Sequence, residues 1–208
     1  SIGLNTLDII RQFPQKFQIE ALSCRNSIEQ LCEQIREFKP RLVCVNTSDQ
    51  ARELRESFRS RHSCPETEFV WGMEGLKQIS RDPEVDLVMA AIVGAAGLEP
   101  TFSAVEAGKI VAVANKEPLV MAGELFVQTA KKTGAKLLPT DSEHNAIFQA
   151  LHNESPERIA RLILTASGGP FRDLPLDEFE QITLDEALNH PNWEMGRKIT
   201  IDSATMMN

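Results

Sequence analysis

The sequence predicts an α/β fold in which a doubly wound, mostly parallel sheet is followed by part of an α+β domain. Short apolar runs alternate with segments of helical period over residues 5–137. Two of these runs, 87–93 and 110–114, are apolar throughout, which is typical of parallel strands covered on both faces. The alternation stops beyond residue 140. We therefore expect a Rossmann-like domain over 1–139 and a second domain over 140–208.

Each element follows from the pattern of apolar residues along the chain. The strands of the sheet are predicted at 17–23, 41–46, 68–71, 86–93, 109–114 and 136–138. The helices that cover them are predicted at 27–38, 49–61, 73–80, 101–107 and 118–132, with a first helix beginning near Asn5. In the second domain we expect a helix over 143–152 and a strand over 161–166.

Composition excludes several classes of protein. The formal net charge of -8 disfavours binding to nucleic acid or to anionic membranes. The sequence has no apolar stretch long enough to span a membrane and no leader pattern, so a cytoplasm-like compartment is expected. The widely spaced cysteines form no C-x-x-C pair and indicate reduced thiols; they are Cys24, Cys32, Cys44 and Cys64.

Polar residues follow several predicted strands, where doubly wound sheets bind their ligands. After the first strand, Arg25, Asn26 and Ser27 stand where an acidic residue would favour NAD, so they favour NADP. The pair Gly94 and Gly97 permits close approach of a ligand to the backbone. The alternatives are a solvated loop for the first group and simple turn geometry for the glycines. The run 115–117 follows another strand and starts a helix, so it is a further candidate for ligand contact. The alternative is that Lys116 and Glu117 only form a charged pair on the surface.

The run 140–143 follows the last predicted strand and admits two interpretations. On an extended backbone, Asp141 and Glu143 project to the same side and would share a hard divalent cation. The competing interpretation is a capping box, in which Thr140 and Glu143 start a helix. Two carboxylates seldom complete a metal site, so the residues alone leave both interpretations open.

Taken together, the motifs resemble one family, 1-deoxy-D-xylulose 5-phosphate reductoisomerase, over nearly the whole chain. The segments that carry the resemblance are 88–98, 114–117, 141–149 and 167–172, with two runs that end at Lys198 and Asn208. The resemblance implies an NADPH-binding domain over 1–139 and an incomplete α+β catalytic domain over 140–208. It also implies that three features of the family lie outside this chain. These are the first strand of the sheet, the third metal ligand, which is a Glu soon after Asn208, and a substrate-binding Lys directly after Asn208.

The resemblance assigns roles by position. Asp141 and Glu143 would bind Mg²⁺ or Mn²⁺ and act in catalysis together with Lys116. Contacts with a small phosphorylated sugar would come from Lys116, Ser142, Ser167, His190, Ser203 and Asn208. Contacts with NADPH would come from Ser1, Ile2, Arg25, Asn26, Ser27, Asn115, Glu117 and Gly196. A mobile lid would include the Gly168–Gly169 turn and Trp193.

The implied activity is the isomerisation and reduction of 1-deoxy-D-xylulose 5-phosphate to 2-C-methyl-D-erythritol 4-phosphate in non-mevalonate isoprenoid synthesis. The full-length protein would be a homodimer in the bacterial cytoplasm or the plastid stroma. One alternative is a different NADP-dependent dehydrogenase in which Asp141 and Glu143 only cap a helix. The other is a non-catalytic fragment, and we expect the isolated 208 residues to be inactive.

Overall fold

The structure is a computed structural model that describes residues 2–60 and 66–207. The chain forms two compact units, Ser1–Ala150 and Leu151–Asn208. Predictions for Ser1, Cys64, Asn208 and the end of the third helix at Arg61 lie outside the described residues. The predicted division after residue 139 stays a prediction. No helix in the described part of the chain is long and apolar enough to cross a membrane.

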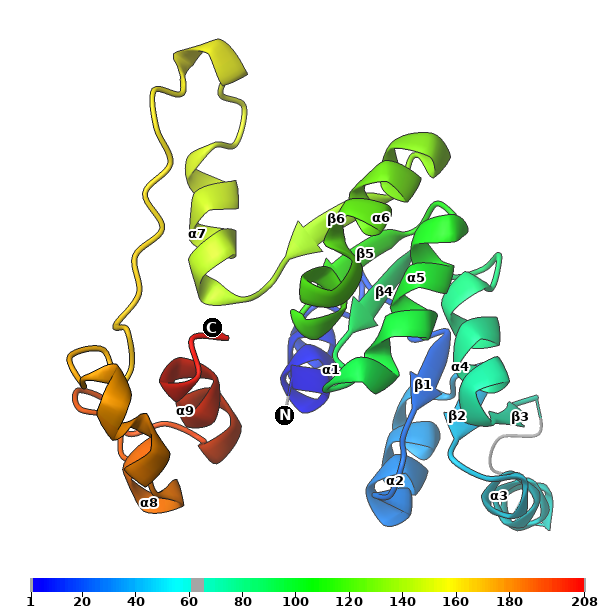
Figure 1. The fold of residues 1–208 in the computed structure, drawn as a ribbon. Coiled ribbons are helices and arrows are strands. Elements are labelled where there is room, and N and C mark those ends of the chain that lie inside the picture. Colours follow the sequence, from blue (N-terminus) through cyan, green and yellow to red (C-terminus); the bar gives the residue numbers. More distant parts are fainter. Residues whose placement is uncertain (1, 61–65, 208) are drawn as a thin grey trace. The chain divides into compact units, whose positions relative to one another are not determined.

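The described residues of the first unit form two parallel sheets of three strands each (Figure 1). One sheet has the order β1 (Ala21–Ser23), β2 (Leu42–Val45), β3 (Glu68–Trp71). The other has the order β4 (Leu87–Ala90), β5 (Ile110–Val113), β6 (Lys136–Pro139). The predicted α/β class with parallel strands is confirmed. The first strand is shorter than predicted because pairing with β2 begins only at Ala21, opposite Leu42.

Helices connect these strands as predicted. They are α1 (Ile2–Gln12), α2 (Ile28–Phe38), α3 (Ser48–Ser60), α4 (Gly72–Arg81), α5 (Leu98–Glu106), α6 (Glu117–Thr133) and α7 (Ser142–Ala150). The first helix begins at Ile2, earlier than the predicted start near Asn5. A short 3-10 turn over Ala95–Gly97 precedes α5. The helix α6 is kinked at Ala122, whose φ of -146° departs from helical geometry.

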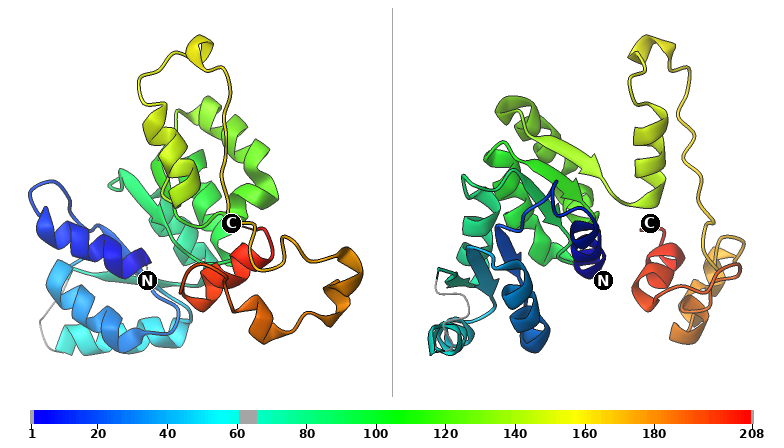
Figure 2. Two further views of the ribbon diagram at one scale, coloured as in Figure 1. Left: turned by 90° about the vertical axis from the view of Figure 1, so that its left-hand side faces the viewer. Right: turned by 180° about the vertical axis from the view of Figure 1, so that it is seen from behind.

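The middle strand β2 is buried on both faces of its sheet, and helices lie around this sheet (Figure 2). Val43, Val45 and Phe69 pack with residues of α2 and α3. Leu42, Cys44 and Val70, which alternate with them along β2 and β3, pack with Ile79 of α4. Because side chains alternate across a strand, a run apolar at every position is what burial on two faces requires.

The sheet of β4, β5 and β6 has its own apolar core. Val111 and Val113 of β5 pack with Val105 of α5 and with Phe126 of α6. Phe126 is fully buried and meets the ring of Phe102 edge to face, with ring centroids 5.3 Å apart. This core holds the strand ends that carry the polar residues of the site.

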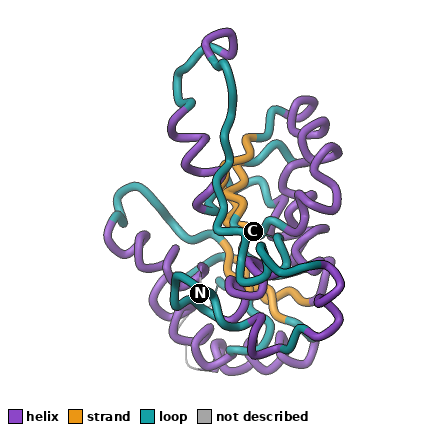
Figure 3. Tube along the Cα trace, turned by 60° about the vertical axis from the view of Figure 1, so that its left-hand side comes forward, coloured by secondary structure: helices purple, strands orange, loops and turns teal. Residues whose placement is uncertain are grey.

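The second unit is built mainly from loops and short helices. Its helical elements are 3-10 turns over Pro156–Arg158 and Leu176–Gln181, with α8 (Leu184–Ala187) and α9 (Arg197–Ala204). Thr183 and Glu186 form a capping box at the start of α8. The predicted strand over 161–166 is wrong: these residues form a loop (Figure 3). Leu162, Ile163 and Leu164 are 58 to 65% exposed, so no described strand covers this apolar run.

Candidate functional site

The carboxyl edge of the sheet of β4, β5 and β6 gathers the polar residues that follow these strands. Ala90, Val113 and Pro139 are aligned across the parallel ladder, so the residues after them lie at one edge. Lys116 lies just beyond β5 and Asp141 just beyond β6. Their side chains form an ion pair, with Lys116 Nζ 3.0 Å from Asp141 Oδ2. The Lys116 side chain is only 13% exposed and that of Asp141 30% exposed, so the pair is shielded from bulk water.

Asn115 holds the glycine turn beside this pair. Its Nδ2 donates to the carbonyl of Gly94 at 3.1 Å, and the residue is 4% exposed. A Cβ at Gly97 would lie 2.6 Å from Asn115 Nδ2 and from the Ile92 carbonyl oxygen, which leaves room only for glycine. Gly97 therefore serves turn geometry, and Asn115 shapes the edge on which a ligand would lie. The close approach of a ligand to this backbone stays a prediction.

The backbone around Asp141 and Glu143 differs from the extended form that was predicted. The carbonyl of Asp141 accepts the first bond of α7, from Asn145 N at 2.9 Å, so Asp141 directly precedes the helix and Glu143 lies in its first turn. Asp141 and Glu143 therefore do not project to the same side in the way that residues two apart on a strand do, and this part of the prediction is wrong. The proposed capping box is also in the wrong register, because the helix begins one residue after the position that Thr140 would require.

Thr140 instead ties the end of β6 to β5. Its backbone N–H and its hydroxyl both donate to the carbonyl of Val113, at 3.1 and 2.9 Å. The Asn145 amide fixes the same bend, since its Nδ2 donates to the Pro139 carbonyl at 2.5 Å. These bonds hold Asp141 at the edge of the sheet, within reach of Lys116.

The donor set at this edge fits part of a site for a hard divalent cation. Asp141 and Glu143 supply carboxylate oxygens, the ligands that Mg²⁺ and Mn²⁺ prefer, and the edge has no thiolate that would select a softer ion. No group of three His, Cys, Asp or Glu side chains that could hold a metal ion occurs among residues 2–60 and 66–207. The assignment of a cation to Asp141 and Glu143 stays a prediction.

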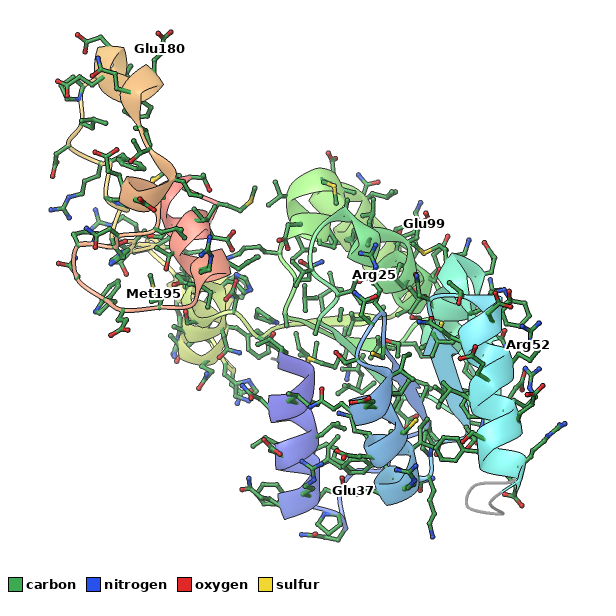
Figure 4. All side chains as sticks on the ribbon, turned by 90° about the horizontal axis from the view of Figure 1, so that it is seen from below. Arg25, Glu37, Arg52, Glu99, Glu180 and Met195 are labelled. Atoms are coloured by element: carbon green, nitrogen blue, oxygen red, sulfur yellow. The ribbon has the colours of Figure 1, made fainter. Side chains whose placement is uncertain are left out.

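The predicted cofactor residues of the first sheet lie in the loop between β1 and α2. Arg25, Asn26 and Ser27 are all exposed, and Figure 4 shows Arg25 on this loop. Ser27 is the N-cap of α2, and its backbone N–H donates to Cys24 Sγ at 3.1 Å. Helix α1 lies beside α2, where Arg11 bonds Glu37 at 2.6 Å. Ile2, at the start of α1, is 49% exposed.

In the second unit, three predicted substrate residues come together. Ser167 Oγ lies 3.0 Å from His190 Nε2 and 3.2 Å from Ser203 Oγ. His190 and Ser203 are each only 8% exposed. They come from two loops and from α9, and they are separated by as many as 36 positions in the sequence. A buried cluster of hydroxyl and imidazole groups is well suited to bind a phosphate or a polyol.

Backbone groups complete this hydroxyl cluster, which we define as Ser167, His190 and Ser203. The N–H groups of Asn192 and Trp193 donate to His190 Nδ1 at 3.2 and 3.1 Å. The indole of Trp193 stacks on the imidazole, with centroids 5.0 Å apart and planes at 12°. Trp193 itself is 59% exposed.

Gly169 is a structural residue of the cluster that sequence reasoning assigned only to a lid. Its N–H donates to Ser167 Oγ at 3.2 Å, and its φ is +70°. A Cβ at this position would lie 2.4 Å from the Ser203 carbonyl oxygen. The Gly168–Gly169 pair was a usable signal in the sequence, because positive φ favours glycine. Gly196 serves as the N-cap of α9, and its carbonyl accepts from Thr200.

Two family models match the chain. Residues 1–123 match the model described as 1-deoxy-D-xylulose 5-phosphate reductoisomerase, and residues 137–208 match the C-terminal domain model of the same name. A reductoisomerase of Shouchella clausii is 51% identical over 208 residues, and one of a Geobacillus species is 50% identical. Each match covers the whole of this chain and 54% or 53% of the relative. The chain thus spans about half the length of these relatives.

Solved structures give the same result. A crystal structure of DOX-P reductoisomerase in complex with NADPH, fosmidomycin and magnesium matches with a TM-score of 0.82 and 45% identity. The reductoisomerase of Zymomonas mobilis in complex with NADPH matches with a TM-score of 0.83 and 38% identity. The matches cover all of this chain and 53% or 52% of the solved chains.

Proposed function

Because this chain belongs to the 1-deoxy-D-xylulose 5-phosphate reductoisomerase family, we propose that its protein isomerises and reduces 1-deoxy-D-xylulose 5-phosphate to 2-C-methyl-D-erythritol 4-phosphate. The reaction uses NADPH and a divalent cation, Mg²⁺ or Mn²⁺, and belongs to non-mevalonate isoprenoid synthesis. The observation that carries the proposal is the Lys116–Asp141 ion pair at 3.0 Å, on the sheet edge where this fold binds ligands.

We assign the cation to Asp141 and Glu143. Bound there, a divalent cation would supply Lewis-acid stabilisation of negative charge on adjacent substrate oxygens. Lys116 holds the Asp141 carboxylate at the edge and offers an ammonium group to the substrate in this shielded position. Ser142, the first residue of α7, is exposed beside them and contacts substrate in this proposal. The matches to relatives solved with magnesium support the assignment.

In this proposal NADPH binds at the carboxyl edges of both sheets, with residues 1–139 as its domain and 140–208 as the domain for metal and substrate. Arg25 forms no ion pair with a described residue, so its guanidinium is available to a 2′-phosphate. Asn26, Ser27, Asn115 and Glu117 lie at the same carboxyl edges, and the start of α1 at Ile2 offers N–H groups to a pyrophosphate. Ser1 and Gly196 complete the proposed set.

The hydroxyl cluster, with Asn208, binds the phosphorylated end of the sugar. Its support is the burial of His190 and Ser203 together with the hydrogen bonds that join them to Ser167. We further propose a homodimer for the full-length protein, in the bacterial cytoplasm or in plastids. The bacterial sources of the relatives support the first location.

The proposal is tested with a chimera in which this chain replaces the matching residues of the Shouchella clausii relative. We expect oxidation of NADPH, followed by absorbance, that requires both 1-deoxy-D-xylulose 5-phosphate and Mg²⁺ and stops when a chelator is added. Oxidation that is independent of the cation would instead favour another NADP-dependent dehydrogenase. The same assay on the 208 residues alone tests the expectation that they are inactive.

A further inference from the structure

We infer that Arg11 is a positioning residue for the cofactor: it ties the last turn of α1 to the last turn of α2 and so fixes the spacing between the first turns of these helices. In the proposed function, those first turns meet the pyrophosphate and the 2′-phosphate of NADPH. The inference rests on the proposed function for the identity of the ligand. The tie between the helices rests on the contacts of Arg11 alone.

Arg11 joins α1 to α2 through both oxygens of one carboxylate. Its Nε and Nη2 donate to Glu37 Oε1 and Oε2, each at 2.6 Å. This paired geometry is the one in which a guanidinium binds a carboxylate most strongly. The guanidinium also lies 5.2 Å from the centroid of the Phe38 ring, and Nη1 donates to Asp8 of its own helix at 2.5 Å. We name the contacts of Arg11 with Glu37 and Phe38 the Arg11 clasp.

Helix α1 has little other attachment to its unit. Over Ile2–Gln12, all of which the structure describes, only Leu7 is buried. The three apolar clusters of the described residues include no side chain of α1. Helix α2, in contrast, places Leu31 and Ile35 in the core beside β2. Because α1 has few apolar contacts, its position depends on the clasp, although an exposed ion pair contributes little to a well-packed helix.

The Arg11 clasp lies at the far end of both helices from the proposed phosphate sites. Figure 4 shows Glu37 at one end of α2 and Arg25 on the loop at the other end. Arg11 lies in the last turn of α1, which begins at Ile2, and the two helices lie side by side in the same direction. Each has 11 residues, so about 16 Å separates the clasp from the first turns. Arg11 therefore acts on the position of α1 and does not touch the cofactor.

The spacing of the two first turns matters because one ligand must reach both. The start of α1 offers N–H groups and the positive end of its dipole to the pyrophosphate. The loop at 25–27 offers a guanidinium, an amide and a hydroxyl to the 2′-phosphate. Both phosphate groups belong to the adenosine part of NADPH, so a site of fixed spacing is preorganised for the whole cofactor. A ligand that carries only the 2′-phosphate does not depend on α1.

The first test measures amide hydrogen exchange in α1 by mass spectrometry. Arg11→Gln and Glu37→Gln should each speed exchange in α1 at least about fivefold, because the helix loses its tie to α2. Arg52→Gln is the matched control, since Arg52 also pairs with an aspartate three residues earlier, Asp49, at 2.8 Å within one helix. It should leave exchange in α1 unaltered. Unaltered exchange in both variants of the clasp would overturn the inference.

The second test measures binding of two ligands to the chain by calorimetry, NADPH and adenosine 2′-phosphate. Glu37→Gln should weaken binding of NADPH at least about fivefold and change binding of adenosine 2′-phosphate less than about twofold. A general loss of structure would weaken both alike, so equal effects on the two ligands would overturn the role of Arg11, as would unaltered binding of NADPH. If the unaltered chain binds neither ligand, the NADPH site of the proposed function fails, and the positioning of a cofactor by Arg11 fails with it.

Discussion

In the first unit most of the buried side chains are apolar, whereas in the second unit the buried side chains are polar. Behind Lys116 and Asp141 lie buried strands and helices, with Val111, Val113 and Phe126 at most 2% exposed. In the second unit the buried polar side chains are His190, Thr200, Asp202 and Ser203, and no apolar side chain among residues 151–207 is buried. The first site therefore has an apolar core behind its polar contacts, whereas the second depends on hydrogen bonds among the site residues themselves.

The difference has a consequence for stability. Apolar burial is the dominant favourable contribution to folding, so the first unit holds its strand ends in place without a ligand. The hydroxyl cluster depends on a few bonds, each of which contributes about 1 kcal/mol net. We therefore expect substitutions in the first unit to alter folding and substitutions in the second to alter binding.

The largest effect is expected in the apolar core. Phe126→Ala removes a fully buried ring that packs on Phe102. The free energy of unfolding should fall by about 3–5 kcal/mol, as for other buried aromatic residues. Urea unfolding followed by circular dichroism measures it. As a control, Phe179→Ala in the second unit, where the side chain is 42% exposed, should change the free energy of unfolding by less than about 1 kcal/mol.

The substitution Gly169→Ala should have a smaller effect on folding than Phe126→Ala but a large effect on binding. A Cβ there would meet the Ser203 carbonyl at 2.4 Å on a backbone with φ of +70°. The strain is about 1–3 kcal/mol and falls on the hydroxyl cluster, so binding of the sugar phosphate should weaken at least about tenfold. Gly123→Ala is the matched control, since a Cβ at Gly123 meets nothing within 4 Å. Unchanged binding by the Gly169 variant would show that the cluster tolerates displacement.

The smallest effect concerns a thiol in the core of the first unit. Burial raises the pKa of Cys44 from its ordinary 9.0 to about 12, and the residue is 1% exposed. The folded state therefore holds this proton at pH values where the unfolded chain releases it, and stability from this group declines as pH rises from about 9 toward 12. Below that range, mass spectrometry should find Cys24 alkylated before Cys44. Early labelling of Cys44 would mean that the core opens locally.

The pattern of apolar residues predicted the first unit well, because a strand that is buried on both faces must be apolar at every position. The strand β5 and the helix α6 occur where the apolar pattern put them, whereas β4 ends at Ala90 and not at the predicted residue 93. The same rule failed at 161–166, whose apolar residues are exposed in the described structure. An apolar run shows that a segment has side chains that could be buried. Whether the segment becomes a strand depends on a partner strand elsewhere in the chain.

The candidate site was also predicted only in part from the sequence. The meeting of Lys116 and Asp141 follows from two parallel strands that end at one edge, which a sequence can indicate. The extended geometry expected for Asp141 and Glu143 was wrong because α7 begins at once. The grouping of Ser167 with His190 and Ser203 has no local signal, since loops set it, and only the family resemblance predicted it.

Binding of Mn²⁺ to the chain, measured by electron paramagnetic resonance, shows whether Asp141 helps to hold a divalent cation. We predict that Asp141→Asn weakens Mn²⁺ binding at least about tenfold, because it removes a charged oxygen ligand. Glu99→Gln, which changes an exposed carboxylate paired with Lys77 at 3.5 Å, should leave binding unaltered. Equal Mn²⁺ affinity in the unaltered chain and in Asp141→Asn would mean that Asp141 is not a ligand of the cation.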